Sequence, residues 1–302
     1  MPNTVAQHLL TEEQITFFDA NGYLILRNWI QGELLTRLQH AGATWIEQAL
    51  RLDSHDLPRE DFIFAKREVG EVPYRVDYLH EKGMSASLEL LGSPEVLGVA
   101  ESLCGPNFVP TYESMVFKQT GDGEAIRWHQ DAVHPRRHRI FNYDLYLDPS
   151  ISGAGALMVM PGSQTTKLAA CEFERLNGWT PPGAIEVEME PGDVLLHDVM
   201  VIHGSPRAIG KALRRTVYYE FRAAEQILEE GPWDRDWIDR RLSLLPLALR
   251  AYDRAFPDAP SYDWHPAPEF EAHLIPDEES VLRVLHKMHT KGSHCSAGSV
   301  LA

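Results

Sequence analysis

The chain has 302 residues, of which 44% are hydrophobic, and its formal net charge is −16. This content is enough to bury the core of one large domain, and so acidic a chain would repel a phosphate backbone, which argues against nucleic acid as a partner. No run approaches the about eighteen apolar residues that a membrane helix requires, and the N-terminus lacks the basic and apolar regions of a signal peptide. We therefore expect a cytoplasmic protein with no membrane partner. The sequence indicates no oligomeric state.

A helix followed by a strand is predicted at the start of the chain. Thr11 is suited to cap the helix, and Gln14 stands at the capping-box position three residues later, where the two side chains satisfy backbone groups of the first turn. Asn21 and the glycine after it then turn the chain into a strand over residues 23–26. Apolar residues at helical spacing predict a long helix over residues 31–50 that packs on the core.

The next part of the chain is a long mixed segment and then a second helical stretch. Residues 53–83 are charged, contain prolines and are long for a loop, and long loops are typically functional or disordered. Residues 85–104 have helical character. Within them, Ser93 is expected to cap a restarted helix that has Pro94 at its first position.

From Phe108 the pattern changes to short strands separated by turn clusters such as T-G-D-G, S-G-A-G and P-G-D. Many short strands with such punctuation indicate a double-stranded β-helix, or jelly roll, of the cupin-like type. The fold class expected is therefore mainly β with flanking helices (α+β). The predicted strands cover residues 108–118, 125–133, 139–147, 156–160, 184–188, 193–196, 200–203 and 214–222.

The chain returns to helical patterns after the strands, over residues 233–252 and 277–291. Nothing indicates an independent second domain, so residues 1–302 are predicted to form a single domain. Its parts are a helical N-terminal part (about 10–104), a jelly-roll core (about 108–223) and C-terminal helices (about 233–291).

Cysteine occurs three times, at Cys104, Cys171 and Cys295. This odd and sparse set has no metal-binding spacing, so reduced thiols in a reducing compartment are expected.

A candidate metal site begins in the stretch Trp128-His129-Gln130-Asp131. On a strand, side chains two residues apart point to the same face, so His129 and Asp131 would offer a nitrogen and an oxygen ligand together. About one H-x-D is expected by chance in a chain of this length, so the pair needs context.

The context is a set of motifs in a fixed order: H-x-D, then Pro161-Gly-Ser, then P-G-D-V-L-L-H ending at His197, then His203-Gly-Ser205, and an arginine eleven positions after His203. This order resembles the phytanoyl-CoA dioxygenase family of Fe(II)- and 2-oxoglutarate-dependent oxygenases. The chain from Leu10 to Leu26 also resembles the N-terminal helix and strand of that family. The resemblance runs from about Leu10 to about Phe221.

The resemblance implies a metal site and a reaction. His129, Asp131 and His203 would hold Fe(II), while 2-oxoglutarate and O2 would take the open positions, as suits non-haem iron oxygenases. His197 matches a family position that is not a ligand, and His134 could be either a group behind the ligands or a substrate-binding group. Related halogenases replace the carboxylate with a small residue, so Asp131 favours hydroxylation, desaturation or ring formation over halogenation.

An arginine is expected to hold the distal carboxylate of 2-oxoglutarate, because a guanidinium pairs with it through two hydrogen bonds. Strand alternation places Arg214 on a polar face, with Thr216, and Arg215 on an apolar face, so Arg214 is favoured and Arg215 is the alternative. The resemblance also implies co-substrate contacts for Ser205, Gln130 and Met115, for which ordinary strand packing is the competing interpretation.

The substrate expected is a small molecule of natural-product type, oxidised with release of succinate and CO2. Arg136, Arg137 and Arg139 could anchor a carboxylate or phosphonate near the iron, or aromatic side chains within 53–83 could enclose an apolar substrate. Two other hypotheses stay open: a cupin-type metalloenzyme that does not use 2-oxoglutarate, and a non-catalytic jelly-roll binding protein.

Overall fold

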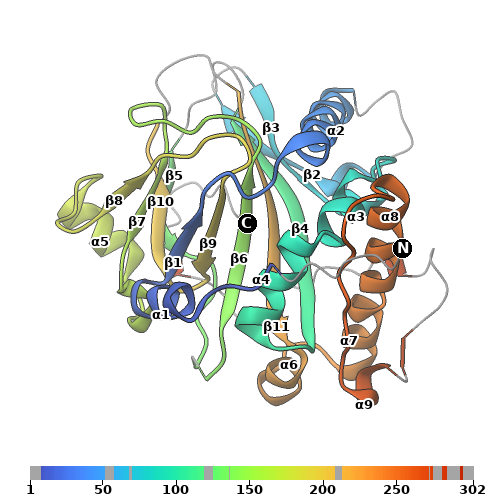
Figure 1. Ribbon diagram of the computed structural model, residues 1–302. Helices are drawn as coiled ribbons and strands as arrows, with labels where there is room; N and C mark the ends of the chain where they lie inside the picture. The colour runs from blue at the N-terminus through green and yellow to red at the C-terminus, as the bar shows by residue number, and fades with distance from the viewer. Residues whose placement is uncertain are drawn as a thin grey trace.

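Two antiparallel β-sheets lie face to face at the centre of the structure, a computed structural model (Figure 1). It describes residues 8–51, 58–67, 70–118, 125–135, 137–207, 213–271, 273–274, 281–283 and 293–294. The larger sheet has the strand order β1-β9-β6-β11-β4-β3-β2, and the smaller has the order β12-β5-β10-β7-β8. This arrangement confirms the mainly β class and the jelly-roll core.

The strands agree closely with the periods read from the sequence, and the eight predicted strands from Phe108 onward are all present. The strands are β1 (Tyr23–Leu26), β2 (Phe62–Arg67), β3 (Gly70–Asp77), β4 (Phe108–Lys118), β5 (Ile126–Gln130), β6 (Ile140–Tyr146), β7 (Leu157–Met160), β8 (Ile185–Val187), β9 (Val194–Asp198), β10 (Ile202–Ser205), β11 (Arg214–Ala223) and β12 (Ser293–His294).

Helices cover the outer face of the larger sheet, and α5 lies on the side of the smaller one (Figure 1). The helices are α1 (Glu12–Asn21), α2 (Gly32–Leu50), α3 (Ala86–Leu91), α4 (Pro94–Cys104), α5 (Ala170–Asn177), α6 (Ala224–Glu230), α7 (Arg235–Leu242), α8 (Leu244–Ala255) and α9 (Pro268–Glu271). None of the described helices has the length and apolarity of a membrane span.

The N-terminal elements form as their local chemistry predicts. The Thr11 hydroxyl accepts a hydrogen bond from the Gln14 backbone, and the Gln14 side chain accepts one from the Thr11 backbone, which confirms the capping box. Helix α2 buries Leu38 and Trp45 in the main hydrophobic core between the helices and the larger sheet. Burial of this apolar stripe is the main force that holds α2 on the sheet.

The segment between α2 and α3 is not the long loop that was predicted. Strands β2 and β3 form a hairpin that extends the larger sheet beyond β4. Pro73 made the segment look irregular, because proline cannot donate to a sheet. The hairpin accommodates it at a register shift between Ile63 and Phe64, where Phe64 is the partner of Pro73. Residues 52–57 and 68–69 lie outside the described part.

The helix predictions need three corrections. The chain restarts at Ser93 and Pro94 between α3 and α4 as predicted, but the Ser93 hydroxyl donates to the Leu90 carbonyl and makes no capping hydrogen bond to α4. The predicted helix over 233–252 is divided into α7 and α8 at Ser243, just before Pro246, which is tolerated only in the first turn of a helix. The predicted helix over 277–291 lies mostly outside the described residues.

The cysteines differ from the prediction in part. Cys104 is a free thiol, as expected, and burial raises its pKa to about 12, which makes it a poor nucleophile. Cys171 is disulfide-bonded, so the prediction of reduced thiols is wrong for this residue.

The space between the two sheets is apolar at one end and polar at the other. Tyr146 and Leu195 of the larger sheet pack there against Leu157 and Val159 of the smaller sheet. Because strand side chains alternate, Thr216, the cross-strand partner of Tyr146, faces the same interior. The candidate site lies in this interior.

Candidate active site

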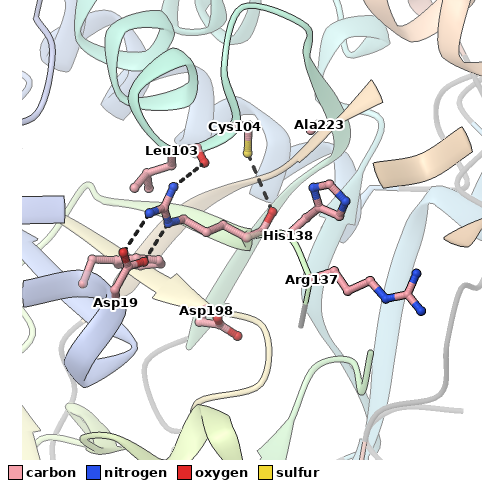
Figure 2. Close-up of a pocket in the computed structure, with 9 residues that line it drawn as sticks. Asp19, Leu103, Cys104, Arg137, His138, Asp198 and Ala223 are labelled. Carbon is pink, nitrogen blue, oxygen red and sulfur yellow. Dashed lines mark hydrogen bonds and ion pairs between the residues drawn. The ribbon is translucent and has the colours of Figure 1, made fainter. Parts of the chain in front are cut away.

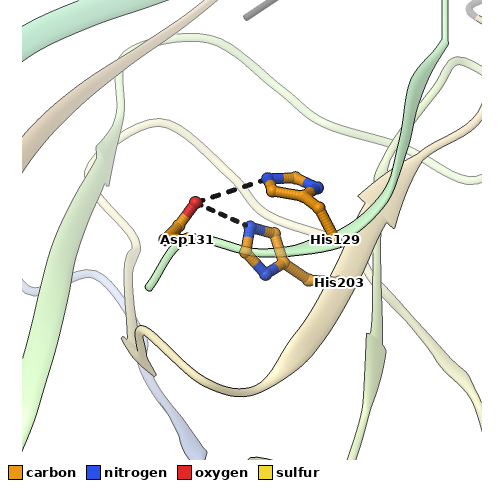
Figure 3. A group of neighbouring side chains, drawn as sticks. All are labelled: His129, Asp131 and His203. Atoms are coloured by element: carbon orange, nitrogen blue, oxygen red, sulfur yellow. Dashed lines mark ion pairs between the residues drawn. The ribbon is translucent and has the colours of Figure 1, made fainter. Parts of the chain in front are cut away.

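Three potential metal ligands converge at the polar end of the interior (Figure 3). His129 on β5 and His203 on β10 are direct cross-strand partners, and Asp131 follows the end of β5. The Asp131 Oδ1 atom lies 3.3 Å from His129 Nε2 and 3.7 Å from His203 Nε2. One ligand atom from each residue lies within 4.8 Å of the others, which is close enough for all three to contact one ion.

Backbone carbonyls orient both imidazoles. His129 Nδ1 lies 2.7 Å from the Arg127 carbonyl, and His203 Nδ1 lies 3.0 Å from the Val201 carbonyl. Each Nδ1 therefore carries the proton, which leaves the Nε2 lone pair directed at the point shared with Asp131. This second contact is the usual way in which a metal-binding histidine is held in its tautomer and orientation.

The second oxygen of Asp131 is fixed from the opposite sheet. Asn142 Nδ2 donates to Asp131 Oδ2 over 2.9 Å, and His197 Nε2 lies 3.1 Å from the same oxygen. His197 Nδ1 contacts the buried Asp144 carboxylate at 2.7 Å. Asp131 is thus positioned by a chain of polar groups on β6 and β9, which leaves Oδ1 directed at the imidazoles of His129 and His203.

The charges of these groups suit metal binding. Burial raises the pKa of Asp131, but the imidazoles around it outweigh burial and hold its pKa well below the usual range. Burial and the neighbouring His129 lower the pKa of His203 to about 3. Burial alone would lower the pKa of His197, but the carboxylates of Asp144 and Asp131 raise it to about 10. At neutral pH Asp131 is ionised and His203 neutral, the states that bind a metal.

The fold separates the two competing arginines as strand alternation predicts. Arg215 points to the helical side, where it pairs with Asp148 at 2.8 Å and donates to the Gln39 carbonyl over 2.6 Å. Arg214 points to the interior, where it donates to the Gly155 carbonyl. The Ser205 hydroxyl donates to the same carbonyl over 2.7 Å. Arg214 and Ser205 therefore meet at one point between the sheets.

Gln130 and Met115 lie elsewhere. The Gln130 amide donates to the carbonyls of Thr166 and Met200 and accepts from the Leu168 backbone, so it fixes the chain after β7. Met115 is buried between the larger sheet and α2, in contact range of Gly42. Strand alternation turns both side chains away from the interior, so the structure offers no support for their co-substrate contacts.

The basic run that follows Asp131 in the sequence was expected to reach the interior, but its described arginines do not. Arg139 binds Asp19 of α1 through two contacts of 2.7 Å, and Arg137 pairs with Glu229 of α6. Both arginines line a cavity of about 380 Å³ that shares no lining residue with the triad. Figure 2 shows this cavity with Arg137 and Asp19 at its edge. The prediction that these arginines anchor a substrate beside the iron is therefore wrong for Arg137 and Arg139, because acidic partners neutralise them. Arg136 lies outside the described residues.

Other residues of the interior were not singled out from the sequence. Asn142 and Asp144 lie on β6. Tyr218 lies on β11 and is the cross-strand partner of Asp144. Lys118 at the end of β4 is the cross-strand partner of Arg214. Their positions depend on strand pairing between distant segments, although the polar residues of β6 could have been flagged by their alternation with Phe141 and Tyr143.

A jelly roll that holds two imidazoles and one carboxylate on one side of a shared point defines a class, the non-haem iron oxygenases with a facial triad. The comparisons with known proteins then give the family. The model of the phytanoyl-CoA dioxygenase (PhyH) family matches residues 18–216, and the chain belongs to this family. It is an oxygenase of the Fe(II)- and 2-oxoglutarate-dependent class.

Individual relatives are distant. A probable phytanoyl-CoA dioxygenase of Caenorhabditis elegans is 24% identical over 69% of this chain and 74% of its own length. The crystal structure of EvdMO1 is 25% identical with a TM-score of 0.61, over 70% of this chain and 50% of EvdMO1, so this chain spans half of that protein. EctD from S. alaskensis, solved with bound Fe, is 19% identical with a TM-score of 0.61, over 78% of this chain and 86% of EctD.

Proposed function

We propose that this chain binds Fe(II) through His129, Asp131 and His203, and binds 2-oxoglutarate beside it, to hydroxylate a small molecule. The observation that carries the proposal is the convergence of two oriented Nε2 atoms and one carboxylate oxygen on a single point. When bound, iron, 2-oxoglutarate and O2 supply the oxidising power, with release of succinate and CO2.

Arg214 and Ser205 are the proposed partners of the distal carboxylate of 2-oxoglutarate. Both are in the interior and both donate to the same carbonyl, so an acceptor oxygen at that point is already favoured. A guanidinium keeps its charge at any working pH and presents a planar fork that matches a carboxylate. A second crystal structure of EctD from S. alaskensis contains 2-oxoglutarate together with 5-hydroxyectoine, which makes a small substrate beside this co-substrate a reasonable expectation for the fold.

Asp131 supports hydroxylation as the outcome. Its carboxylate occupies the third ligand position, and its other oxygen is held by Asn142 and His197. It therefore leaves no position for a halide where related halogenases have a small residue. Desaturation and ring formation would use the same residues, and the products of a reaction with substrate would separate them.

The substrate is proposed to be a small and polar molecule. The wall formed by β3 and β4 carries the half-buried Arg75, whose guanidinium lies 3.0 Å from Asp77. The Tyr112 hydroxyl donates to Asp77 over 2.8 Å. Arg75 and Asp77 on β3 are the cross-strand partners of Val116 and Ser114 on β4. Strand register therefore places their side chains, together with that of Tyr112, on the interior face. Such a wall offers donors and acceptors together, which suits a hydroxylated or amino-bearing substrate.

An anaerobic titration tests this function. Metal-free protein is titrated with Fe(II) and then with 2-oxoglutarate, while the weak visible charge-transfer band of the chelated keto acid is recorded. We expect a band in the wild type, no band in His203→Ala and a weakened band in Arg214→Ala. If metal binds but no band forms at any concentration of 2-oxoglutarate, the proposal is wrong and a cupin-type metal chemistry replaces it.

The cytoplasmic location stays a prediction. The disulfide bond at Cys171 gives it no support, because structural disulfides are rare in reducing compartments.

A further inference from the structure

We propose that Tyr218 is a further co-substrate-binding residue, whose hydroxyl donates a hydrogen bond to the iron-chelating end of 2-oxoglutarate. The inference rests on the proposed function and assigns a residue that the sequence motifs do not include. Its basis is the position of this phenol between the metal ligands and Arg214, together with the hydrogen bonds that the protein itself offers it.

Tyr218 lies on the interior face of β11, on the same side as Arg214. Its neighbours Val217 and Tyr219 belong to the hydrophobic core on the helical side of the sheet. Because side chains alternate along a strand, Tyr218 points the other way, and its cross-strand partner on β6 is Asp144. Tyr218 is half-buried, so a ligand between the sheets can reach its exposed part.

The hydroxyl of Tyr218 makes no hydrogen bond to any residue that the structure describes. Other tyrosines of the two neighbouring strands differ in this respect. The Tyr219 hydroxyl donates to the Ser87 carbonyl over 2.6 Å, and the Tyr112 hydroxyl donates to Asp77 over 2.8 Å. A phenol inside a protein usually finds a hydrogen-bond partner, and a ligand in the interior would supply one to Tyr218.

The surroundings of Tyr218 keep its hydroxyl protonated. Burial and the carboxylate of Asp144 raise the pKa of Tyr218 well above its usual value. Arg214 opposes this shift and Asp131 adds to it, so the phenol is close enough to both to feel their charges. At neutral pH the hydroxyl is therefore uncharged and can donate to the oxygen of a bound carboxylate.

Along β11, Tyr218 lies towards the metal ligands and Arg214 lies at the other end of the site. The two residues are four positions apart, which is about 13 Å along a strand. Asp144, the partner of Tyr218, contacts His197, which in turn contacts Asp131. A 2-oxoglutarate molecule with its distal carboxylate on Arg214 extends from there towards Asp131, so its iron-chelating end comes to Tyr218.

Tyr218 and Arg214 would thus hold different ends of one ligand. Arg214 contacts the distal carboxylate, which 2-oxopentanoate lacks although its chain has the same length. Tyr218 contacts the keto-acid end, which the two compounds share. A hydrogen bond to a charged group contributes more than one between neutral groups, so losing the Tyr218 hydroxyl should weaken both keto acids, whereas losing Arg214 should weaken 2-oxoglutarate alone.

The experiment compares these two keto acids on iron-loaded protein without O2. Dissociation constants are measured by calorimetry for the wild type, Tyr218→Phe and Arg214→Ala. We expect Tyr218→Phe to bind both keto acids about 10- to 100-fold more weakly than the wild type. Arg214→Ala should lose affinity for 2-oxoglutarate and bind 2-oxopentanoate as the wild type does.

Tyr143→Phe is the matched control. The Tyr143 hydroxyl is also buried without a hydrogen-bond partner among the described residues. It lies on the helical face of the larger sheet, where Tyr143 is the cross-strand partner of Tyr219. The control therefore removes the same atom from a similar environment that the ligand does not touch, and it should bind both keto acids as the wild type does.

The visible charge-transfer band gives a second measurement, which a role in packing alone would not change. Absorption in this band moves an electron from iron to the chelated keto acid, and a hydrogen bond to that end stabilises the added negative charge. At saturating 2-oxoglutarate, the band of Tyr218→Phe should therefore lie at a shorter wavelength than that of the wild type. Tyr143→Phe and Arg214→Ala should keep the wild-type wavelength.

Two results would overturn the inference. Unchanged affinity of Tyr218→Phe for both keto acids would mean that the hydroxyl does not contact the co-substrate, and a loss confined to 2-oxoglutarate would place it at the distal carboxylate. Thermal unfolding confirms that each variant is folded. If the wild type itself binds no 2-oxoglutarate, the proposed function fails, whereas wild-type binding with an unchanged Tyr218→Phe removes this inference alone.

Discussion

At the residue scale, the site depends on groups that do not touch the metal position. Asp131 has one oxygen free for the ligand point, because Asn142 and His197 hold the other. His197 is itself fixed by the buried Asp144. Partners of this kind orient the ligands and tune their basicity, and their loss typically lowers metal affinity by 10- to 100-fold.

We therefore expect His197→Gln to bind Fe(II) about 10- to 100-fold more weakly than the wild type. The measurement is a competition with a chelator of known affinity, carried out without O2. His138→Gln is a matched control, because His138 contacts Glu229 near the surface and should leave the affinity unchanged. Equal affinities for wild type and His197→Gln would show that Asp131 needs no support from this side.

The two neighbouring arginines should behave in opposite ways. Arg215→Ala removes the partner of the half-buried Asp148, so the free energy of unfolding should fall by about 3 kcal/mol. Arg214→Ala should leave stability within about 0.5 kcal/mol and weaken 2-oxoglutarate binding by about 10- to 100-fold. Denaturant unfolding measures the stability of the two variants, and calorimetry measures their affinity for 2-oxoglutarate. A stable Arg215→Ala variant that has lost 2-oxoglutarate binding would reverse the assignment.

At the element scale, the helices that support the larger sheet approach one another closely. Gly92 caps the end of helix α3, and an added Cβ at this position would lie 2.1 Å from the Ala248 carbonyl oxygen of α8. The φ angle of Gly92 is −81°, so the backbone itself would accept any residue. Glycine is required here by contact between helices and not by local conformation.

Gly92→Ala should consequently lower the free energy of unfolding by about 1–3 kcal/mol. Without the contact, the same change would stabilise the protein by about 0.4–1 kcal/mol, because alanine restricts the unfolded chain. The sign of the change, measured by denaturant unfolding, decides between the two cases. Arg254→Ala on the exposed side of α8 is the control and should fall within about 0.5 kcal/mol of the wild type.

At the scale of the whole molecule, the C-terminal part of the chain is tied to the hairpin region by a buried ion cluster. Asp61 Oδ2 lies 2.5 Å from Lys82 Nζ, and Arg283 binds both oxygens of Asp61 over 2.7–2.9 Å. Arg283 also contacts Glu81 at 2.7 Å. One carboxylate thus joins three segments that are far apart in the sequence.

Asp61→Asn should cost about 3–5 kcal/mol of unfolding free energy, because it leaves Lys82 buried beside a neutral group. Burial raises the pKa of Asp61, but hydrogen bonds from Arg283 and Lys82 outweigh burial and lower its pKa. A lowered folded-state pKa gives stability that is present above the unfolded value of about 4 and is lost as the pH falls through the folded value.

Unfolding of wild type and Asp61→Asn across pH 2–7 tests this linkage. The difference between them should be constant above about pH 5 and should shrink as the pH falls. Asp263→Asn, at an exposed aspartate beside His265, should follow the wild type throughout. A difference that stays constant down to pH 2 would show that the charge of Asp61 is not what stabilises the cluster.

The sequence by itself determined the local structure and singled out three candidate ligands. Side-chain periods of two fixed the strands of the jelly roll, and caps such as Thr11 fixed the start of α1, because both depend on residues close together in the chain. The motifs around His129 and His203 indicated the metal set that the fold brings together. Alternation along β11 also sufficed to turn Arg214 inward and Arg215 outward.

Only the tertiary structure decided which distant residues share an environment. The pairing of β4 with β11 sets Lys118 beside Arg214, and the facing sheets bring His197 to Asp131. The tertiary structure also places Arg139 of the basic run against Asp19, which pairs the charge of this arginine. Strand pairing and ion pairs of this kind follow from burying the two sheets against each other, and no local pattern encodes which surfaces meet.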